Sequence, residues 1–296
     1  MVRFSLLLAV TLVALSACTP KKGDQADAGA SSAGTRTKPD RPSGTLTLRF
    51  LDVGQGDAVL VTTSDGKTML YDGGRSTTRM RAHLQAFGVH QVDLMVASHA
   101  DFDHIAGLEA VAKDAKVRYF VNSGLAGTTD TWRRLVDALQ AQKTTFVKAS
   151  ARTFTLGDAT VQILPPPAGM PDDQNLNSVG VLVKFGAFRA LMTGDSETAE
   201  TKAWLAAGAL DGLGPVNVYK SIHHGAANGD NAAWLAAVQP QNVVIGVGKN
   251  NYGHPTRTAL NLYKSVGAKV YRTDRNGTVT VTVQADGSFE LQPERP

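Results

Sequence analysis

The sequence predicts an α/β protein, because short apolar segments alternate with segments of helical pattern and because polar, glycine-bearing clusters follow the predicted strands. Residues 92–97, for example, form an apolar run bounded by polar residues, which is typical of a buried strand, and residues 105–111 look like the start of a helix. The 29 glycines and the hydrophobic content of 43% fit a globular protein with many tight turns. Loops that follow strands carry the sites of α/β proteins, so these clusters are candidate functional residues.

The elements fall into two similar halves, 44–165 and 175–296, each made of strands followed by helices. Asp65-Gly66 is a hairpin signal, and Asn276-Gly277 and Asp286-Gly287 are turns between the two or three last strands. In the first half we predict strands at 45–51, 58–62, 68–71, 92–97, 116–122 and 160–164, and helices at 77–87, from 105 and at 132–142. In the second half we predict strands at 179–185, 188–193, 216–222 and 243–245, and helices at 197–207, 231–238 and 257–266.

The first 18 residues have the organisation of a secretory signal. A short positive start precedes an apolar run at 4–15, which is too short for a comfortable transmembrane helix. The run closes with Leu15-Ser16-Ala17-Cys18, which resembles the lipobox of bacterial lipoproteins, where the cysteine is lipidated and becomes the new N-terminus. We therefore expect a membrane anchor on Cys18 and a location outside the cytoplasm, at the outer membrane and periplasm or the cell surface. The alternative is an ordinary signal peptide with a cysteine near its cleavage site.

Residues 19–43 contain no Val, Ile, Leu, Met, Phe, Tyr or Trp. Such a segment cannot bury enough apolar surface to offset the entropy of ordering it, so we predict a disordered tether that precedes an ordered domain at 44–296. Cys18 is the single cysteine, which excludes an internal disulfide and a cysteine-based metal site. The net charge of +4 is spread along the chain and does not indicate a nucleic-acid-binding surface.

The segment after the strand at 92–97 carries four metal-ligand side chains within six residues: His99, Asp101, Asp103 and His104. Residues two apart in an extended loop point to the same side, so the first three can converge on one point. Imidazole with carboxylate suits zinc, and the high carboxylate content also admits manganese or iron. The alternative is a solvated acidic loop with two incidental histidines.

Further candidates follow later strands. Asp195 comes after Gly194 at a strand end, His223-His224-Gly225 follows the strand at 216–222, and His254 precedes Pro255 in a loop. Each alone has a structural explanation as a turn, a helix-cap region or a surface loop. Because all of them follow strands, we expect them to meet the first loop at one site.

These segments together resemble the metallo-β-lactamase superfamily and, more narrowly, the extracytoplasmic hydrolase domain of ComEC-type DNA-internalisation competence proteins. The resemblance spans nearly all of 45–285, with the motifs in the expected order. The matching segments are Phe50-Leu51-Asp52-Val53-Gly54-Gln55-Gly56-Asp57, Asp72-Gly73-Gly74, His99-x-Asp101-x-Asp103-His104, Asn177-Ser178, Thr193-Gly194-Asp195, His223-His224-Gly225, Tyr252-Gly253-His254-Pro255 and Tyr271-Arg272-Thr273-Asp274 with Asn276-Gly277.

The resemblance implies a four-layer αβ/βα sandwich with one or two divalent metal ions, zinc or manganese, at the seam between the halves. Asp101 stands where the superfamily usually has a histidine, and no histidine lies between His104 and His223. Asp72 would orient a ligand histidine or position the metal loop. The implied metal ligands are His99, Asp101, Asp103, His104, Asp195 and one of His223 and His224.

The chemistry that follows from the resemblance is metal-assisted hydrolysis by an activated water. Asp103 would orient that water. His254, together with whichever of His223 and His224 is not a ligand, would contact a phosphate or protonate the leaving oxygen. Asn177 and Ser178 would contact the substrate.

The function that we predict is a lipid-anchored phosphodiesterase or nuclease that acts on DNA outside the cytoplasm. The chain has one short apolar run, at its start, so a DNA-uptake role would need a separate channel protein. One alternative is hydrolysis of another envelope phosphodiester, such as phosphocholine or a polymer. The other is a non-catalytic binding lipoprotein. The sequence leaves the oligomeric state open.

Overall fold

The structure, a computed structural model, describes residues 42–296. The predicted signal peptide, Cys18 and nearly all of the predicted tether lie outside the described residues. The described part belongs to one unit, residues 39–296. Ser43, which we placed in the tether, already contacts this unit, because its backbone N and its Oγ donate hydrogen bonds of 2.7 and 2.8 Å to Asp158.

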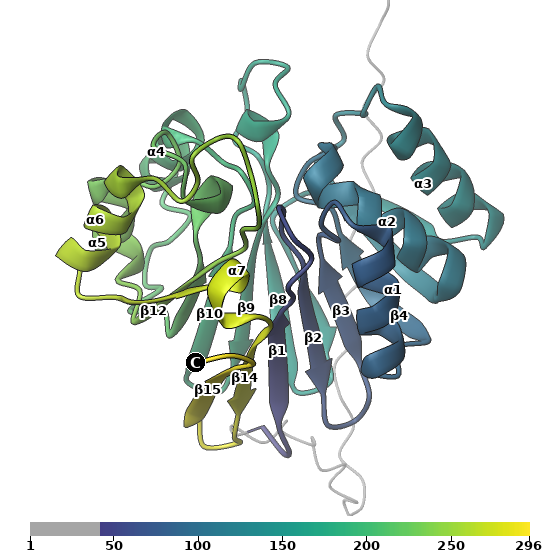
Figure 1. Cartoon of the computed structure of the whole chain (residues 1–296), viewed down its shortest axis with the longest axis horizontal. Helices are drawn as coiled ribbons and strands as arrows, with labels where there is room; N and C mark the ends of the chain where they lie inside the picture. Colours follow the sequence, from purple (N-terminus) through teal and green to yellow (C-terminus); the bar gives the residue numbers. More distant parts are fainter. Residues whose placement is uncertain (1–41) are drawn as a thin grey trace, which may run out of the picture. The chain divides into compact units, whose positions relative to one another are not determined.

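Two β-sheets form the centre of the unit (Figure 1). The first has eight strands in the order β15-β14-β1-β2-β3-β4-β5-β6 and the second has seven in the order β13-β12-β11-β10-β9-β8-β7. The strands of the first sheet are β1 (Leu46–Phe50), β2 (Val59–Thr63), β3 (Thr68–Tyr71), β4 (Gln91–Val96), β5 (Lys116–Asn122), β6 (Thr145–Lys148), β14 (Val279–Val283) and β15 (Phe289–Pro293). Those of the second are β7 (Arg152–Leu156), β8 (Ala159–Leu164), β9 (Gly180–Phe185), β10 (Phe188–Met192), β11 (Val218–Lys220), β12 (Asn242–Ile245) and β13 (Lys269–Arg272).

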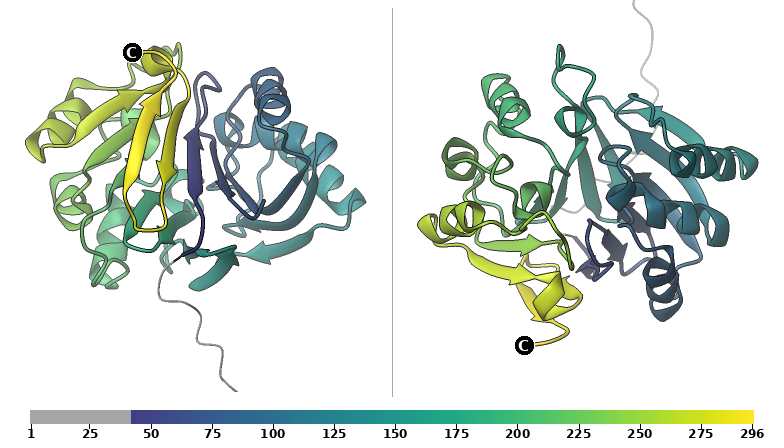
Figure 2. Two further views of the ribbon diagram at one scale, coloured as in Figure 1. Left: turned by 90° about the horizontal axis from the view of Figure 1, so that it is seen from below. Right: turned by 45° about the horizontal axis from the view of Figure 1, so that its top comes forward.

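Helices cover the outer face of each sheet, which gives the predicted four-layer αβ/βα sandwich (Figures 1 and 2). On the first sheet lie α1 (Thr77–Ala86), α2 (Phe102–Asp114) and α3 (Asp130–Ala141). On the second lie α4 (Thr198–Ala206), α5 (Ala232–Val238) and α6 (Arg257–Ser265). The remaining helical elements are single turns: η1 (Asn175–Asn177), η2 (Ile222–Gly225) and α7 (Thr273–Asn276). Among residues 42–296, no helix is both long and apolar enough to span a bilayer.

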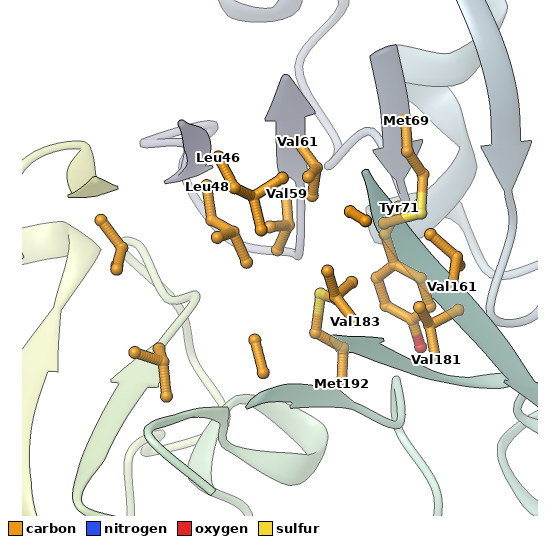
Figure 3. Close-up of a cluster of buried hydrophobic side chains, with 14 of the residues drawn as sticks. Leu46, Leu48, Val59, Val61, Met69, Tyr71, Val161, Val181, Val183 and Met192 are labelled. Carbon is orange, nitrogen blue, oxygen red and sulfur yellow. The ribbon is translucent and has the colours of Figure 1, made fainter. Parts of the chain in front are cut away.

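The inner faces of the two sheets enclose the largest apolar core (Figure 3). Alternation in β1 explains its contribution, because Leu46, Leu48 and Phe50 are buried and the residues between them are partly exposed. Burying one such side chain stabilises the fold by roughly 1.5–3 kcal/mol. The hydroxyl of Tyr71 crosses the core and donates a 2.8 Å hydrogen bond to the carbonyl oxygen of Val179, which fastens β3 to the start of β9.

The two halves expected from the sequence do not coincide with the two sheets. β7 and β8, at the end of the predicted first half, belong to the second sheet. β14 and β15, at the end of the predicted second half, return to the first sheet, where β14 pairs antiparallel with β1. The boundary between the two halves of the sequence therefore differs from the boundary between the sheets, since a strand–helix pattern states which elements exist and leaves their pairing open.

Parallel strands set the position of the candidate residues. β3, β4, β5 and β6 are parallel, and so are β10, β11, β12 and β13. The carboxyl ends of parallel strands meet at one edge of a sheet, so the loops after β3, β4, β10, β11 and β12 share one end of the sandwich. These are the loops that carry the candidate residues.

Candidate metal centre

The loop after β4 is fastened tightly to the loop after β3. The backbone N of Gly73 donates a 2.7 Å hydrogen bond to the carbonyl oxygen of His104, and that of Gly107 donates one of 2.9 Å to Gly74. A Cβ on Gly73 or on Gly107 would collide with the backbone of the other. The sequence therefore needs glycine at both positions for α2 to begin at the site, with Asp101 as its N-cap.

Asp72 fixes the protonation pattern of two histidines. Its carboxylate accepts hydrogen bonds from the backbone N and the Oγ of Ser98, both at 2.7 Å, and lies 2.9 Å from Nδ1 of His104. Oγ of Ser98 gives its hydrogen to Asp72 and so acts as the acceptor for Nδ1 of His99, 2.9 Å away. With hydrogen on Nδ1 of each ring, both Nε2 atoms carry free lone pairs, the form in which imidazole binds a metal.

The loop after β11 has a strained backbone. His223, His224 and Gly225 have φ angles of 50°, 54° and 78°, a left-handed run that side chains other than glycine adopt only under constraint. The constraint comes partly from buried Asp230, which accepts hydrogen bonds from the backbone N of Ile222 at 3.0 Å and from the hydroxyl of Tyr263 at 2.6 Å. Strain of this kind is found at functional sites, where it aims side chains that a relaxed turn would misplace.

Asp195 connects the two loops. Its Oδ1 lies 3.2 Å from Nε2 of His104, and its Oδ2 lies 3.3 Å from Nε2 of His224. Nδ1 of His224 lies 2.8 Å from the carbonyl oxygen of Gly246, which makes Nε2 the free nitrogen of this ring too. Asp103 completes the cluster, with Oδ2 3.4 Å from Nε2 of His224.

This cluster fits a metal ion. Donor atoms of four buried residues, Asp57, His104, Asp195 and His224, all lie within 4.8 Å of one another. Within residues 42–296, Nε2 of His99, His104 and His224 and Oδ1 of Asp195 are buried without a hydrogen-bond partner. Buried polar atoms are normally paired, because leaving one unpaired costs about 1–3 kcal/mol. A divalent cation within this cluster would satisfy Nε2 of His104 and of His224 together with Oδ1 of Asp195, so the donor set fits the cofactor that the sequence implies.

The electrostatics favour a cation at the same place. Burial disfavours the charged forms of His104, His224 and Asp195. The charges of Asp195 and Asp72 nevertheless raise the pKa of His104 well above its usual range, and those of Asp195 and Asp57 do the same for His224. The two imidazoles likewise outweigh burial at Asp195 and hold the pKa of its carboxyl well below the usual range. Carboxylates therefore outweigh the local positive charge, and a divalent ion would balance them.

Asp57 and Lys220 belong to the site and were not predicted as site residues. The Lys220 ammonium is buried and contacts the Asp57 carboxylate, whose Oδ1 lies 3.2 Å from Nδ1 of His224. Burial opposes ionisation of Asp57, but Lys220 and His224 hold the pKa of its carboxyl below the usual range. A lysine inside the predicted strand at 216–222 was the available signal, since lysine is almost never fully buried without a partner.

A cavity of about 170 Å³ opens above the cluster and gives substrate access to it. Asp101 lies at its edge with half of its side chain exposed and with Oδ2 3.5 Å from Nε2 of His99. His223 faces it with Nε2 3.5 Å from Asp195, and the His254 ring centroid is 5.6 Å from that of His223. The lining residues are Gln55, Asp101, Asp103, Asn175, Asp195, His223, His224, Tyr252 and His254.

The remaining candidate residues differ in their burial and in whether they line the cavity. His224 is the buried member of the histidine pair, which favours it over His223 as a ligand. Asn177 is turned away from the cavity, because its amide donates to the carbonyl oxygens of Pro171 and Asp173 at 2.7 and 2.8 Å. Ser178 is fully buried, and neither it nor Asn177 lines the cavity. Asn175 lines it instead, a position that the spacing of the motif did not reveal.

The fold and this site agree with the comparison to known families. A family model described as the metallo-beta-lactamase superfamily matches residues 51–249, most of the chain, so the chain belongs to that superfamily.

Relatives among known proteins include ComE operon protein 3 of Bacillus subtilis, 26% identical over 82% of this chain, and competence protein ComA of Neisseria gonorrhoeae, 28% identical over 80%. The matches cover 34% and 32% of those proteins, so the chain spans about a third of their length. Among solved structures, CmlA, a diiron β-hydroxylase from Streptomyces venezuelae, superposes with a TM-score of 0.55 at 20% identity, over 81% of this chain and 54% of its own. That likeness shows the fold alone.

Proposed function

We propose that this protein is a metal-dependent phosphodiesterase that acts on DNA outside the cytoplasm, where a lipid on Cys18 anchors it to a membrane. One observation carries the catalytic part: donor atoms of Asp57, His104, Asp195 and His224 converge beneath the cavity, and Nε2 of both histidines has no hydrogen-bond partner. A divalent ion there would supply Lewis-acid activation of a water nucleophile near neutral pH. Zinc suits the imidazoles and manganese suits the carboxylates.

Asp103 is positioned to orient the attacking water. It lines the cavity, and 28% of its side chain is exposed. Burial raises the pKa of this carboxyl, but the adjacent imidazoles of His224 and His104 together hold it well below the usual range. Asp103 is therefore ionised at neutral pH and can accept a hydrogen bond from water.

His223 and His254 are positioned to contact the phosphate and the leaving oxygen. Burial lowers the pKa of both imidazoles, and for His254 the neighbouring His223 lowers it further. Both rings are therefore neutral at pH 7 and can donate an N–H to a phosphate oxygen. Both histidines line the cavity, which places their rings beside a bound substrate.

Two observations support DNA as the substrate. Competence proteins are among the relatives, although this chain spans only about a third of their length. Tyr252, at the cavity, is 70% exposed, and its ring lies 5.6 Å from His254 at an angle of 31°. An exposed aromatic ring beside a phosphodiester site offers a stacking surface for an unpaired base.

A second candidate is a smaller envelope phosphodiester, such as a phosphocholine group. The size of the cavity, about 170 Å³, favours it, because this volume accommodates a headgroup more readily than a polymer. The residues that act would be the same. Only the contacts beyond the phosphate would differ.

Cleavage of two substrates tests the proposal. The purified protein is incubated with labelled single-stranded DNA or with bis-p-nitrophenyl phosphate, with added zinc or manganese. We expect cleavage of both by the wild type, loss in Asp103→Ala, and normal rates in Asp137→Asn, a control that changes an exposed carboxylate on α3. Cleavage of the small ester alone would favour the headgroup substrate. Metal binding without cleavage of either would reject catalysis and favour a binding lipoprotein.

The anchor is tested separately, by the distribution of the protein between membrane and soluble fractions. We expect the wild type in the membrane fraction and Cys18→Ser outside it. If the variant fractionates as the wild type does, the lipidation proposal fails.

A further inference from the structure

Gln55 lies at the cavity because the loop between β1 and β2 packs against two of the loops that form the site. Gly56 touches the loop after β4, since a Cβ on it would collide with the carbonyl oxygen of Asp103. Gly248, in the loop after β12, is so close that a Cβ on it would collide with the backbone N of Gln55. The side chain of Gln55 is 2% exposed and lines the cavity. Loops of both sheets therefore hold this residue at the site.

One hydrogen bond fixes the orientation of the Gln55 amide. The backbone N of Gly248 donates to Oε1 of Gln55 over 3.3 Å. The reverse orientation would set the amide NH₂ against another donor, so the oxygen faces Gly248 and Nε2 is the free end. Nε2 is buried and has no hydrogen-bond partner among residues 42–296. Because an unpaired buried donor costs free energy, a partner from outside the chain would be bound favourably here.

Nε2 of Gln55 differs in kind from the other unpaired atoms of the site. Nε2 of His104 and of His224 and Oδ1 of Asp195 offer lone pairs, which a cation would bind. An amide nitrogen offers only hydrogens, so a cation cannot satisfy it. Its natural partner is an oxygen atom that carries negative charge. The cavity therefore has a hydrogen-bond donor for an anion in the same wall system that holds the metal ligands.

We propose that Nε2 of Gln55 donates a hydrogen bond to a non-bridging oxygen of the phosphate that is cleaved. This inference deepens the proposed function and rests on it. The cavity is small, about 170 Å³, so a phosphate group in it lies near the wall that Gln55 forms. When water attacks a phosphodiester, the non-bridging oxygens carry the negative charge of the transition state, and a donor already held in place stabilises that charge. Gln55 is then a catalytic residue beside Asp103.

Binding of inorganic phosphate tests the role of Gln55 without any measurement of cleavage. The purified full chain is loaded with zinc, freed of excess metal and titrated with phosphate in a calorimeter. Gln55→Met keeps the approximate shape of the side chain and has no donor. We expect it to bind phosphate about tenfold or more weakly than the wild type, because a hydrogen bond to a charged oxygen is lost. Its zinc affinity, measured against a chromophoric chelator, should equal that of the wild type, because an amide N–H does not ligate a metal.

Two further variants separate the donor from the shape of its loop. Gln55→Glu keeps an oxygen for Gly248 and places an acceptor where the donor was, so it should bind phosphate at least as weakly as Gln55→Met. Asp52→Ala is the matched control, since it removes the 3.2 Å hydrogen bond from the backbone N of Gly54 in the same loop and no cavity atom. Phosphate affinity in this control should equal that of the wild type.

Four outcomes would overturn the proposal. One is a zinc-loaded wild type that binds no phosphate, and another is wild-type phosphate affinity in Gln55→Met or in Gln55→Glu. The third is equal weakening in Asp52→Ala, which would show that only the shape of the loop matters. The last is a loss of zinc affinity in Gln55→Met, which would place the residue in the support of the metal.

The role of Gln55 and the proposed function fail in different ways. A wild type that binds phosphate through Gln55 and cleaves no phosphodiester would overturn the proposed function and leave the phosphate contact standing. Cleavage by Gln55→Met at the wild-type rate, with wild-type phosphate affinity, would do the reverse. If both proposals hold, kcat for bis-p-nitrophenyl phosphate should fall about 10²-fold in Gln55→Met, with a smaller change in KM.

Discussion

The candidate site has two sides that differ in how the protein supports them. On the buried side, acceptors of the protein itself hold Nδ1 of each histidine, whereas the side chains of the open side line the cavity. The buried side consists of His104, His224, Asp195, Asp57 and Asp72, and the open side consists of Asp101, Asn175, His223, Tyr252 and His254. The buried side is therefore organised before any ion binds, whereas the geometry of the open side depends on the ion and the substrate.

The largest effect is expected where both sides meet, at Asp195. Its Oδ2 lies 3.3 Å from Nε2 of His224, which belongs to the buried side, and 3.5 Å from Nε2 of His223, which belongs to the open side. Asp195→Asn removes the charge that both histidines face, so kcat for phosphodiester cleavage should fall on the order of 10³-fold or more. Steady-state kinetics with Asp137→Asn as control measures this. Activity within a few-fold of the wild type would mean that the two sides work independently.

The next largest effect is expected on stability, at Glu200, which lies beneath the open side. Burial raises the pKa of Glu200 to about 9, and this residue lies on α4 beside η1. Below about pH 4.5 both the folded and the unfolded chain hold its proton, so the residue has no effect there. Between about pH 4.5 and the pKa of Glu200 in the folded chain, only the unfolded chain releases the proton, so the free energy of unfolding declines as the pH rises. At pH 7 this decline amounts to about 3 kcal/mol.

Glu200→Gln removes this dependence. We expect the variant to be more stable than the wild type at pH 7 by about 3 kcal/mol and equally stable near pH 4, as measured by urea unfolding. Glu290→Gln, an exposed carboxylate on β15, is the control and should change neither value. An equal gain at both pH values would show that Glu200 is not protonated in the folded chain.

Asp72→Asn damages the support under the ligand histidines. Asparagine has one acceptor oxygen, so it cannot replace both Oδ1, which accepts from the backbone N of Ser98, and Oδ2, which accepts from Nδ1 of His104. The tautomer of His104 is then no longer fixed, and zinc affinity, measured against a chromophoric chelator, should fall by about 10–100-fold. It should stay unchanged in Asp114→Asn, an exposed ion-pair residue on α2. Zinc affinity that is the same in Asp72→Asn as in the wild type would contradict this supporting role.

The smallest effect is expected at the rim. Tyr252→Ala removes the exposed ring, and the loss of one base stack, about 1 kcal/mol, should raise KM for single-stranded DNA roughly fivefold. KM for bis-p-nitrophenyl phosphate should not change, because this ester has no base. Tyr252→Phe keeps the ring and should behave as the wild type. A rise for both substrates in Tyr252→Ala would show that the ring shapes the cavity and does not stack on a base.

Local pattern predicted most elements of the fold and failed at β6 and β7. Leu48 and Val117 illustrate the successes, because each lies in a run whose alternation or apolarity follows directly from burial. β6 and β7 are mostly exposed, so their residues carry little apolar pattern, and we did not predict either strand. Strand pairing across the two sheets was likewise out of reach, since it depends on contacts between distant segments.

The metal loop was predictable, and the residues that complete the site were less so. His99 and His104 can be identified as candidate ligands from the local sequence, because several ligand types fall within six residues. Asp57, Asn175 and Tyr252 lie in loops of ordinary composition, and only the packing of distant loops brings them to the cavity. Local spacing reveals ligands that share a segment, whereas tertiary structure is needed for those that do not.

The pairing of β1 with β14 has a consequence for how the chain is made. Val281, in β14, lies opposite Leu48, in β1, so the second neighbour of the first strand leaves the ribosome long after that strand. Until then β1 keeps one edge without a partner, and an unpaired edge invites association with other chains. The first sheet therefore cannot close before β14 is synthesised, and the newly made chain is prone to association with other chains in the interval.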